Sequence, residues 1–490
     1  MKHLFFAGLA ACSASPGGAQ VPLTLDTSFR CGLVYASLTD AHPLADGRLW
    51  IVGRISFDGT NPVPSSRRLL PNGSLDPEIG LGSLSGGTIV ETPEYFYSPA
   101  GGGPRRMRLD GTAIYDFNPG PANTPYPGLV GYDWGDINVQ SDGKILCTGA
   151  SQLDYAFGFD SPGWYSVFRL CDNARLDSTY DMRTTDGTIW SLEPTGEDQF
   201  FASGVFTTYE GVPVGRIVRI WADGELDTTY QSPILKGYAK CFIQQPDGRM
   251  IVGGQFVLPN DPDTMHLIRL LPDGALDSTF HNDTEYKHLP QFSFGDFAFG
   301  VNDIEQLADG NIIVGGNFTH MDGQLRRGVA LVDSLGNLLN TAFTGAGCGL
   351  AAQINSTHTY SGLASIDPAP DGSIYLVGEF NGFDDGVVSD TAQRMICRLH
   401  GLNVGVSEHQ AKANDGLRVY PNPGSGQITV EWPGHLIKTM RFVDAQGRCA
   451  YAITCASCVR ADVNVPSSGL YVLIVEDEQG DRISTKLTKP

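Results

Sequence analysis

The segments CFIQQPDGRMIVGGQF (Cys241–Phe256) and HLIRLLPDGALDSTF (His266–Phe280) decide the fold of this 490-residue chain. Each contains an Asp-Gly pair between two apolar runs, which is typical of a tight hairpin turn whose glycine adopts a positive φ. The two segments therefore predict four antiparallel strands. The apolar runs show little alternation, as in sheets that are buried on both faces.

Both halves of this unit recur along residues 24–400. First halves begin at the Asp-Gly pairs of residues 46, 142, 309 and 371, and weaker copies lie near Pro93–Ser98 and Gln199–Phe206. Second halves end in a Leu-Asp pair, with the aspartates Asp26, Asp76, Asp177, Asp227 and Asp277. A repeat of roughly 50 residues is typical of a propeller or a solenoid. We expect the Leu-Asp aspartates to bond neighbouring backbone amides.

The two ends of the repeat region complement each other. It opens with a lone fourth strand, Leu23–Phe29, and ends with a third strand, Arg394–His400. We expect the first to complete the last sheet and to close a ring, because one such sheet cannot bury both of its faces alone. The predicted fold is an all-β, seven-bladed β-propeller over residues 20–400, followed by a small C-terminal β-sandwich. An open solenoid is the alternative.

These repeats resemble the delta-60 repeat family of bacterial β-propellers. The resemblance rests on five good copies of the Asp-Gly strand element together with the Leu-Asp segments. The second and fourth copies depart from the pattern, because Glu94-Tyr95 and Glu197-Asp198 stand where Asp-Gly is expected. The boundaries of those two repeats are therefore open.

The N-terminus is typical of an export signal over residues 1–19. A short basic start precedes the apolar stretch Leu4–Ala11, and small residues follow at Gly17–Ala19. A buried strand is one alternative reading. Leu9–Cys12 also resembles a lipoprotein box, so lipidation at Cys12 is a second alternative.

The C-terminus predicts a second domain. Residues 401–415 are typical of a linker, and residues 416–490 predict a β-sandwich. Four motifs resemble the C-terminal sorting domain of the type IX secretion system of Bacteroidetes. They contain Tyr420, Pro421, Asn422 and Pro423, then Asp444 and Gly447, then Gly469 and Tyr471, and finally Lys486 and Leu487. The resemblance implies export across the outer membrane through that machinery, removal of the tail, and release or surface attachment. An adhesive sandwich module is the alternative.

Composition excludes some functions and leaves others open. The formal net charge is −21, with 33 basic and 54 acidic residues, which argues against a nucleic-acid partner. No apolar run is long enough to span a membrane as a helix. We expect a monomer without a cofactor.

Nine cysteines remain beyond Cys12, and Cys455 and Cys458 have the spacing of a metal knuckle or redox pair. Zinc requires four ligands and the chain has no second such pair, so a local disulfide or free thiols are favoured.

The sequence contains no catalytic signature that we can identify. Polar residues stand four positions before the first turn of five repeats, namely His42, Asn138, Glu193, Glu305 and Asp367, whereas Ile243 occupies this position in the fifth repeat. On the innermost strands they would ring the axial channel and bind a cation or polar ligand, perform glycoside chemistry, or line a water-filled channel. The acidic loops Asn260–Asp263 and Asp384–Gly386 suggest calcium sites or, preferably, solvated turns.

These observations favour a secreted or surface-bound, non-catalytic propeller that binds a glycan, protein or surface component. The alternatives are a secreted hydrolase or lyase with carboxylates in the channel, and a structural envelope protein.

Overall fold

The computed structural model describes residues 23–400 and 418–489, except for 58–62, 81, 85–86, 100–102, 115–116, 118–130, 134, 154–162, 196–197, 260–262, 288–299, 308, 342, 353–358, 361, 421–426, 434–435, 445–448, 465–468 and 478–481. The described residues form strands and turns without an α-helix, and none of their segments is a helix that could cross a membrane. They belong to two compact units, one ending at His400 and the other beginning at Arg418.

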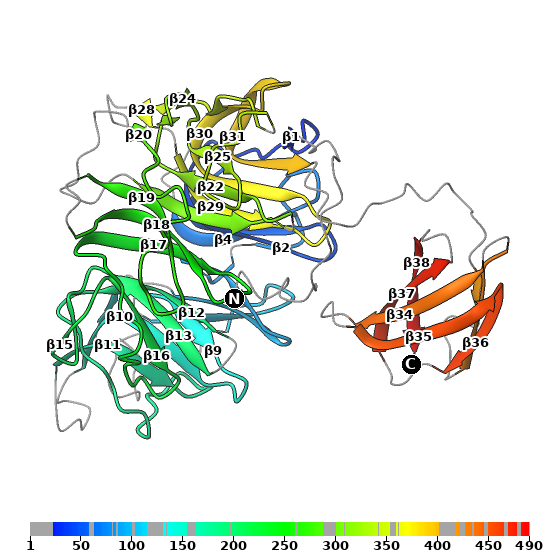
Figure 1. The fold of residues 1–490 in the computed structure, drawn as a ribbon, viewed down its shortest axis with the longest axis horizontal. Helices are drawn as coiled ribbons and strands as arrows, with labels where there is room; N and C mark the ends of the chain where they lie inside the picture. The colour runs from blue at the N-terminus through cyan, green and yellow to red at the C-terminus, as the bar shows by residue number, and fades with distance from the viewer. Residues whose placement is uncertain are drawn as a thin grey trace. The chain divides into compact units, whose positions relative to one another are not determined.

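The first unit consists mainly of antiparallel sheets that succeed one another along the chain (Figure 1). The first three contain β2 (Tyr35–Pro43), β3 (Leu49–Ser56) and β4 (Val63–Leu69); β5 (Val90–Glu91), β6 (Tyr95–Ser98) and β7 (Arg105–Arg108); and β8 (Gly131–Asp133), β9 (Ile137–Val139), β10 (Ile145–Leu153) and β11 (Gly163–Leu170). The next three contain β12 (Ile189–Pro194), β13 (Gln199–Gly204) and β16 (Ile217–Trp221); β17 (Lys236–Gln244), β18 (Met250–Val257) and β19 (Met265–Leu270); and β21 (Val301–Gln306), β22 (Ile312–Gly316) and β25 (Val329–Val332).

The last sheet joins the two ends of the unit. It contains β29 (Gly362–Pro368), β30 (Ile374–Asp384), β31 (Ser389–His400) and β1 (Thr24–Leu25), with β26 (Gly347–Cys348) also on β30. Strand β1 pairs antiparallel with β31, so that Thr24 lies opposite His400 and Leu25 opposite Leu399. The predicted pairing of the N-terminal strand with the last repeat is confirmed.

Hydrophobic clusters lie between successive sheets, because each sheet is apolar on both faces. Trp50 and Val52 of β3 pack with Phe96 of β6, for example, and Ile243 of β17 packs with Ile304 of β21. The same arrangement joins the last sheet to the first, where Val377 and Ile396 pack with Leu38, Ala41 and Ile51. Within the described residues of this unit, such clusters connect each of the sheets named above to the next one.

The fourth segment of six repeats differs from the prediction, because it makes a single bridge to the third strand, such as Leu270 to Leu276, instead of a regular ladder. In the last sheet the fourth segment is β1, which forms two pairs with β31. A turn follows the fourth segment, in which Asp277, for example, accepts hydrogen bonds from the backbone N–H and hydroxyl of Thr279.

Each Leu-Asp aspartate also binds an arginine on the third strand of its own repeat. The Asp277 carboxylate accepts a hydrogen bond from Arg269 Nε at 2.8 Å, and the Arg269 guanidinium lies over the Phe280 ring. Equivalent pairs join Arg68 to Asp76, Arg169 to Asp177 and Arg219 to Asp227. The predicted backbone bonds of these aspartates are confirmed, and the arginine partner is an addition that the sequence did not indicate to us.

The ring closure reproduces this unit from residues at opposite ends of the propeller region. Asp26 of the opening segment pairs with Arg398 of β31, and Arg398 lies over the ring of Phe29. The contact that closes the last sheet therefore has the same three residue types, an aspartate, an arginine and an aromatic residue, as the repeats that are continuous in sequence.

Acid will weaken these contacts in a defined pH range. Burial alone would raise the pKa of Asp26 and Asp277, but hydrogen bonds from Ser28 and Arg398, and from Thr279 and Arg269, lower both pKa values to about 2. The stabilisation is complete above the unfolded pKa of roughly 4 and is lost as the pH falls through the folded pKa. We expect the urea midpoint of this unit to fall between pH 4 and about pH 2.

The control for the acid prediction is Asp277→Asn, which removes one of the titrating groups. This variant should be less stable at neutral pH and should lose less stability over the acid range, measured by tryptophan fluorescence in urea at several pH values. An unchanged dependence on pH would show that Asp277 does not contribute.

Small hairpins extend some connections of the first unit. They are β14 (Thr208–Tyr209) with β15 (Val212–Pro213), β20 (Tyr286–Lys287) with β23 (His320–Met321) and β24 (Gln324–Leu325), and β27 (Ala351–Ala352) with β28 (Thr359–Tyr360). The turns of two hairpins, Glu210-Gly211 and Asp322-Gly323, have positive φ at both residues, as a two-residue type I′ turn requires.

The second unit consists of two antiparallel sheets. One contains β32 (Arg418–Tyr420), β33 (Gln427–Glu431) and β36 (Arg460–Asn464), and the other β35 (Cys449–Cys458), β34 (Ile437–Asp444), β37 (Gly469–Asp477) and β38 (Arg482–Lys489). One hydrophobic cluster contains residues of both sheets, including Val430 of β33 and Met440 and Leu473 of β34 and β37. The core of this unit therefore lies between its two sheets.

Candidate functional site

The five predicted polar residues all lie on the strand that leads into the first turn of a repeat, which is called its first strand below. His42 is on β2, Asn138 on β9, Glu193 on β12, Glu305 on β21 and Asp367 on β29. These strands contact one another in sequence: β9 contacts β12, β12 contacts β17, β17 contacts β21, β21 contacts β29, and β29 contacts β2. The first strands of these sheets therefore lie next to one another.

The structure joins two of the five to specific neighbours. His42 Nε2 lies 2.7 Å from a carboxylate oxygen of Glu91 on β5, and its ring packs edge-on against Phe96. Asp367 is buried and accepts a hydrogen bond from Ser365 Oγ at 2.9 Å. Glu91 was not among the predicted residues, because the second repeat lacks the Asp-Gly pair from which the positions were counted.

A further set of carboxylates lies two positions before the predicted ones. Asp40 and Asp303 directly follow β-bulges, Asp136 directly precedes β9, and each of the three accepts a backbone N–H from the next sheet. The donors are Ile89 to Asp40 at 2.8 Å, Leu192 to Asp136 at 3.2 Å, and Ile366 to Asp303 at 2.8 Å. These aspartates connect neighbouring sheets.

In the last sheet a serine, Ser365, stands at the equivalent position, two residues before Asp367. Ser365 Oγ lies 3.2 Å from a carboxylate oxygen of Asp40 as well as 2.9 Å from Asp367. The last and first sheets are thus bridged at their innermost strands. The sequence carries a signal for this set in the recurring patterns Asp40-x-His42, Asp136-x-Asn138 and Asp303-x-Glu305.

Asp136 has the most unusual electrostatic environment among these carboxylates. Burial raises its pKa to about 6, and the negative charge of the nearby Glu193 adds to the rise. Its two oxygens accept the backbone N–H groups of Ile137 and Leu192. A carboxyl with a raised pKa is a possible general acid, but both oxygens of Asp136 are occupied by the backbone that it holds in place.

The bulges of β12 and β17 present an aromatic and a basic side chain. Trp190 and Lys240 are the extra residues at the two bulges, between Ile189 and Ser191 and between Ala239 and Cys241. The half-buried Trp190 ring packs edge-on against Tyr238 of β17, with ring centroids 5.2 Å apart. Lys240 and Lys236 are exposed, and within the described part of the chain neither lies within ion-pair distance of a carboxylate.

One aspartate of the acidic loop Asp384–Gly386 is buried and the other is not. Asp385 is 2% exposed, and one of its oxygens accepts the backbone N–H of Leu25 at 2.7 Å while the other accepts those of Val387 and Val388. Asp384 accepts the exposed N–H of Gly386. Asp385 therefore fastens strand β1. The other acidic loop, at 260–263, lies largely outside the described residues.

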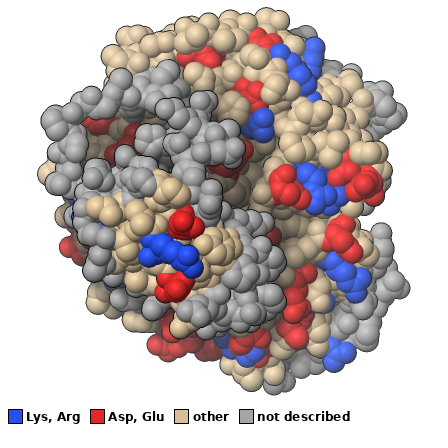
Figure 2. All heavy atoms as spheres, turned by 90° about the vertical axis from the view of Figure 1, so that its right-hand side faces the viewer, with Lys and Arg blue, Asp and Glu red and all other residues tan. Residues whose placement is uncertain are grey.

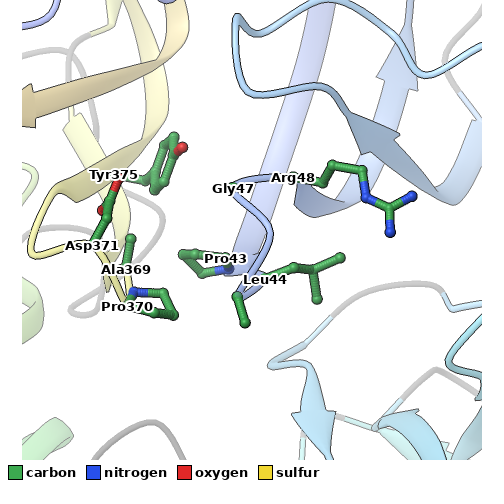
Figure 3. A pocket seen from close by; sticks show the side chains of 9 residues that line it. Pro43, Leu44, Gly47, Arg48, Ala369, Pro370, Asp371 and Tyr375 are labelled. Atoms are coloured by element: carbon green, nitrogen blue, oxygen red, sulfur yellow. The ribbon is translucent and has the colours of Figure 1, made fainter. Parts of the chain in front are cut away.

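A small hollow lies between the first and last sheets (Figure 3). The turn of Pro43–Arg48 faces the turn of Ala369–Asp371, with Tyr375 on one side, and the Arg48 side chain points away from the opposing turn. The cavity measures about 30 Å³, which suits one or two water molecules rather than an organic ligand. Within the described residues no group of three or more His, Cys, Asp or Glu side chains is arranged to hold a metal ion.

The surface carries charges of both signs with an excess of acid. Figure 2 shows several basic side chains of the visible face directly beside acidic ones. Arg48 with Asp46 and Arg249 with Asp247 are examples of such surface pairs. Among the described residues, Lys236 and Lys240 have no such pair.

The predicted sorting motifs are partly described. Tyr420 ends β32, is exposed, and its hydroxyl lies 3.1 Å from a Glu431 carboxylate oxygen. Asp444 ends β34, and Gly469 and Tyr471 lie on β37, where Asp444 is opposite Tyr471. Pro421, Asn422, Pro423 and Gly447 lie outside the described residues.

Two family models match the chain. The model described as a domain of unknown function (DUF5122) beta-propeller matches residues 44–78, 201–230, 245–280 and 307–338. The model described as a secretion system C-terminal sorting domain matches residues 418–489. The matches agree with the two families that the repeats and the C-terminal motifs resemble. No curated protein matches the chain.

Solved structures share only low identity with this chain. The extracellular domain of BT4673 from B. thetaiotaomicron, described as a hybrid two component system, is 13% identical with a TM-score of 0.42, over 96% of this chain. The chain spans 59% of the length of that structure. The computationally designed Ika8 protein is 9% identical with a TM-score of 0.40, over 77% of this chain and 99% of the designed one.

Proposed function

Because this chain carries DUF5122 β-propeller repeats and a secretion system C-terminal sorting domain, we propose that it is a secreted or cell-surface binding protein without catalytic activity. The sorting domain implies secretion or export to the cell surface, with the type IX machinery as its partner. The binding module is a closed, seven-bladed propeller, and the exported tail is a β-sandwich.

The proposed blade count is supported by the contacts between sheets. Clusters of apolar side chains connect each described sheet to the next, and Val377 and Ile396 of the last sheet pack with Ile51 of the first. The pairing of β1 with β31 adds the closing strand. The sandwich is supported by the hydrophobic cluster that both sheets of the second unit share.

The observation that carries the binding proposal is the pair Trp190 and Lys240. Trp190 of β12 packs edge-on against Tyr238, which stands two residues before Lys240 on β17, so an aromatic and a cationic side chain come from neighbouring strands. Aromatic stacking and positive charge together recognise sugar rings that bear carboxylates. Lys236 lies on the same strand as Lys240 and adds a second cation. In a chain with net charge −21, an anionic ligand will be attracted to this place rather than to the surface as a whole. The proposed ligand class is therefore an acidic glycan.

The binding test uses the full chain and polygalacturonate, an acidic glycan, with neutral dextran as the control ligand. We expect Trp190→Ala and Lys240→Glu each to weaken binding of polygalacturonate by roughly tenfold or more, which corresponds to about 1.4 kcal/mol. The matched control is Lys144→Glu, because Lys144 is committed to an ion pair with Asp177. Equal binding by all variants, or no preference over dextran, would contradict the proposed surface.

Export by the C-terminal domain is tested separately. Deleting residues 418–489 should leave the propeller in the periplasm, because the part that the secretion machinery recognises is missing. Fractionation and immunoblotting would compare medium, cell surface and periplasm. Normal appearance of the truncated protein in the medium would contradict this role of the tail.

The alternative hydrolase or lyase would need a pair of free carboxylates. Asp40, Asp136 and Asp303 are instead engaged by backbone N–H groups of the neighbouring sheet, which favours a structural role. Glu193 on β12 and Glu305 on β21 are the glutamates through which that alternative can be tested. A Glu193→Gln, Glu305→Gln double variant should leave polygalacturonate binding unchanged, and loss of a glycan-cleaving activity in it would favour the enzyme.

A further inference from the structure

Strand β35 of the second unit contains a bulge between two cysteines. Ile437 of β34 lies opposite Cys458, and Thr439 lies opposite Thr454. Two steps along β34 therefore correspond to four steps along β35, so β35 has two more residues than β34 in this stretch. The bulge brings Cys455 and Cys458 closer together than a regular strand would.

The register limits the distance between the two cysteines. Positions opposite residues two apart on an antiparallel strand are separated by roughly 7 Å. Cys455 follows Thr454 toward Cys458, so the bulge shortens their separation, and the two thiol groups lie within interaction distance of each other. In a regular strand the same three-residue spacing would be roughly 10 Å, which a disulfide cannot bridge.

Both side chains lie on the core-facing side of the strand. Cys455 and Cys458 are each partly buried and pack against the same hydrophobic cluster, together with Ile453. Burial raises the pKa of the Cys455 thiol to about 11, and the adjacent Cys458 thiol adds to the rise. The reduced pair is thus two protonated thiols in contact, which react slowly at neutral pH without an oxidant.

The third cysteine of the tail is too far away to compete. Cys449 lies opposite Val443, six residues along β34 from the position opposite Cys458. This corresponds to roughly 20 Å along the strand. Even Cys455, next to the position opposite Thr439, is separated from Cys449 by about 14 Å or more.

We propose that Cys455 and Cys458 form a disulfide that locks the β35 bulge once the chain reaches an oxidising compartment. In this step two S–H bonds break and one S–S bond forms. The two electrons and two protons pass to the disulfide of a thiol–disulfide oxidant, which becomes a dithiol. The inference goes beyond the binding function and concerns the sorting domain alone.

The redox state of this cysteine pair depends on the compartment in which the domain is located. Before export, in a reducing compartment, the pair stays reduced, and after export it is oxidised. The closed loop is short, so the gain in overall stability is small and the effect is local. The bulge and the register of β34 with β35 are what the bond fixes.

The test uses the purified, reduced full chain and glutathione disulfide as the oxidant, so that its outcome does not depend on export. The expected product is two hydrogens lighter by intact mass, with two molecules of reduced glutathione released. Trypsin cuts at Arg448 and Arg460 and chymotrypsin after Tyr451, which separates Cys449 from the other two. The linked peptide should contain Cys455 and Cys458 only.

Variants define the outcomes further. Cys449→Ser should still form the bond, whereas Cys455→Ala and Cys458→Ala should instead carry a mixed disulfide with glutathione on the remaining thiol. Protection of the buried Cys147 and Cys397 from iodoacetamide would show that the first unit is still folded. Alkylation of both Cys455 and Cys458 after oxidation, or a link to Cys449, would overturn the proposal.

Discussion

Replacing Asp277 with alanine will lower the free energy of unfolding of the propeller unit by roughly 3–5 kcal/mol, the range found when a buried ion pair loses one partner. The Arg269 side chain is 2% exposed and would lose its carboxylate partner. Thr279 would lose the acceptor for its backbone N–H and its hydroxyl. Arg269 also donates to the backbone oxygen of Ser334 in the next sheet, so its displacement would disturb the contact between two sheets.

The matched control for Asp277 is Asp247→Ala. Asp247 also pairs with an arginine, Arg249, but both side chains are substantially exposed. An exposed pair contributes about 0–1 kcal/mol. Urea unfolding followed by tryptophan fluorescence would measure both variants on the full chain. Similar losses in the two would show that burial does not determine the value of these ion pairs.

Replacing Asp385 with alanine will open the closing sheet and lower the free energy of unfolding by roughly 3 kcal/mol or more. The carboxylate accepts three backbone N–H groups at 2.7 Å, from Leu25, Val387 and Val388. Leaving a buried donor unsatisfied costs about 1–3 kcal/mol for each group. The hydrogen bond from the Leu25 N–H to Asp385 holds β1 in addition to the pairing of β1 with β31.

The neighbouring Asp384 provides the control for Asp385. It accepts one exposed N–H, that of Gly386, so Asp384→Ala should cost about 1 kcal/mol or less. Hydrogen exchange at residues 24–26 should rise strongly in the Asp385 variant and little in the Asp384 variant. Equal exchange rates in the two would mean that β1 is held by its pairing with β31 alone.

The sequence predicted the ring closure because its evidence is local. Leu23–Phe29 has the pattern of a fourth strand and no strands before it, so its place in the last repeat follows from the repeat itself. The arginine partners were not predicted, although four of them stand eight residues before their aspartates, as Arg269 does before Asp277, and this spacing recurs in the sequence. Only the Asp26–Arg398 pair joins residues 372 positions apart, so that it becomes visible when the sheets are in place. The same holds for Asp385, which looks like any acidic turn until β1 lies against it.

Counting back from each turn placed the predicted polar residues in the regular stretch of strand between the turn and the bulge. Asp40 and Asp303 stand directly after the bulges. Their role was not predicted, because the backbone N–H groups that they accept belong to the neighbouring sheet. Trp190 and Lys240 occupy the extra position of a bulge that recurs in other repeats, but the residue type at that position does not repeat.

The sharing of the last sheet between β1 and β31 has a consequence for biosynthesis. Strand β1 is made before its partner β31, because His400 lies 376 residues after Thr24. Until His400 has been synthesised, the closing pair of strands cannot form. The order of synthesis therefore delays the final step of folding until the whole repeat region is available.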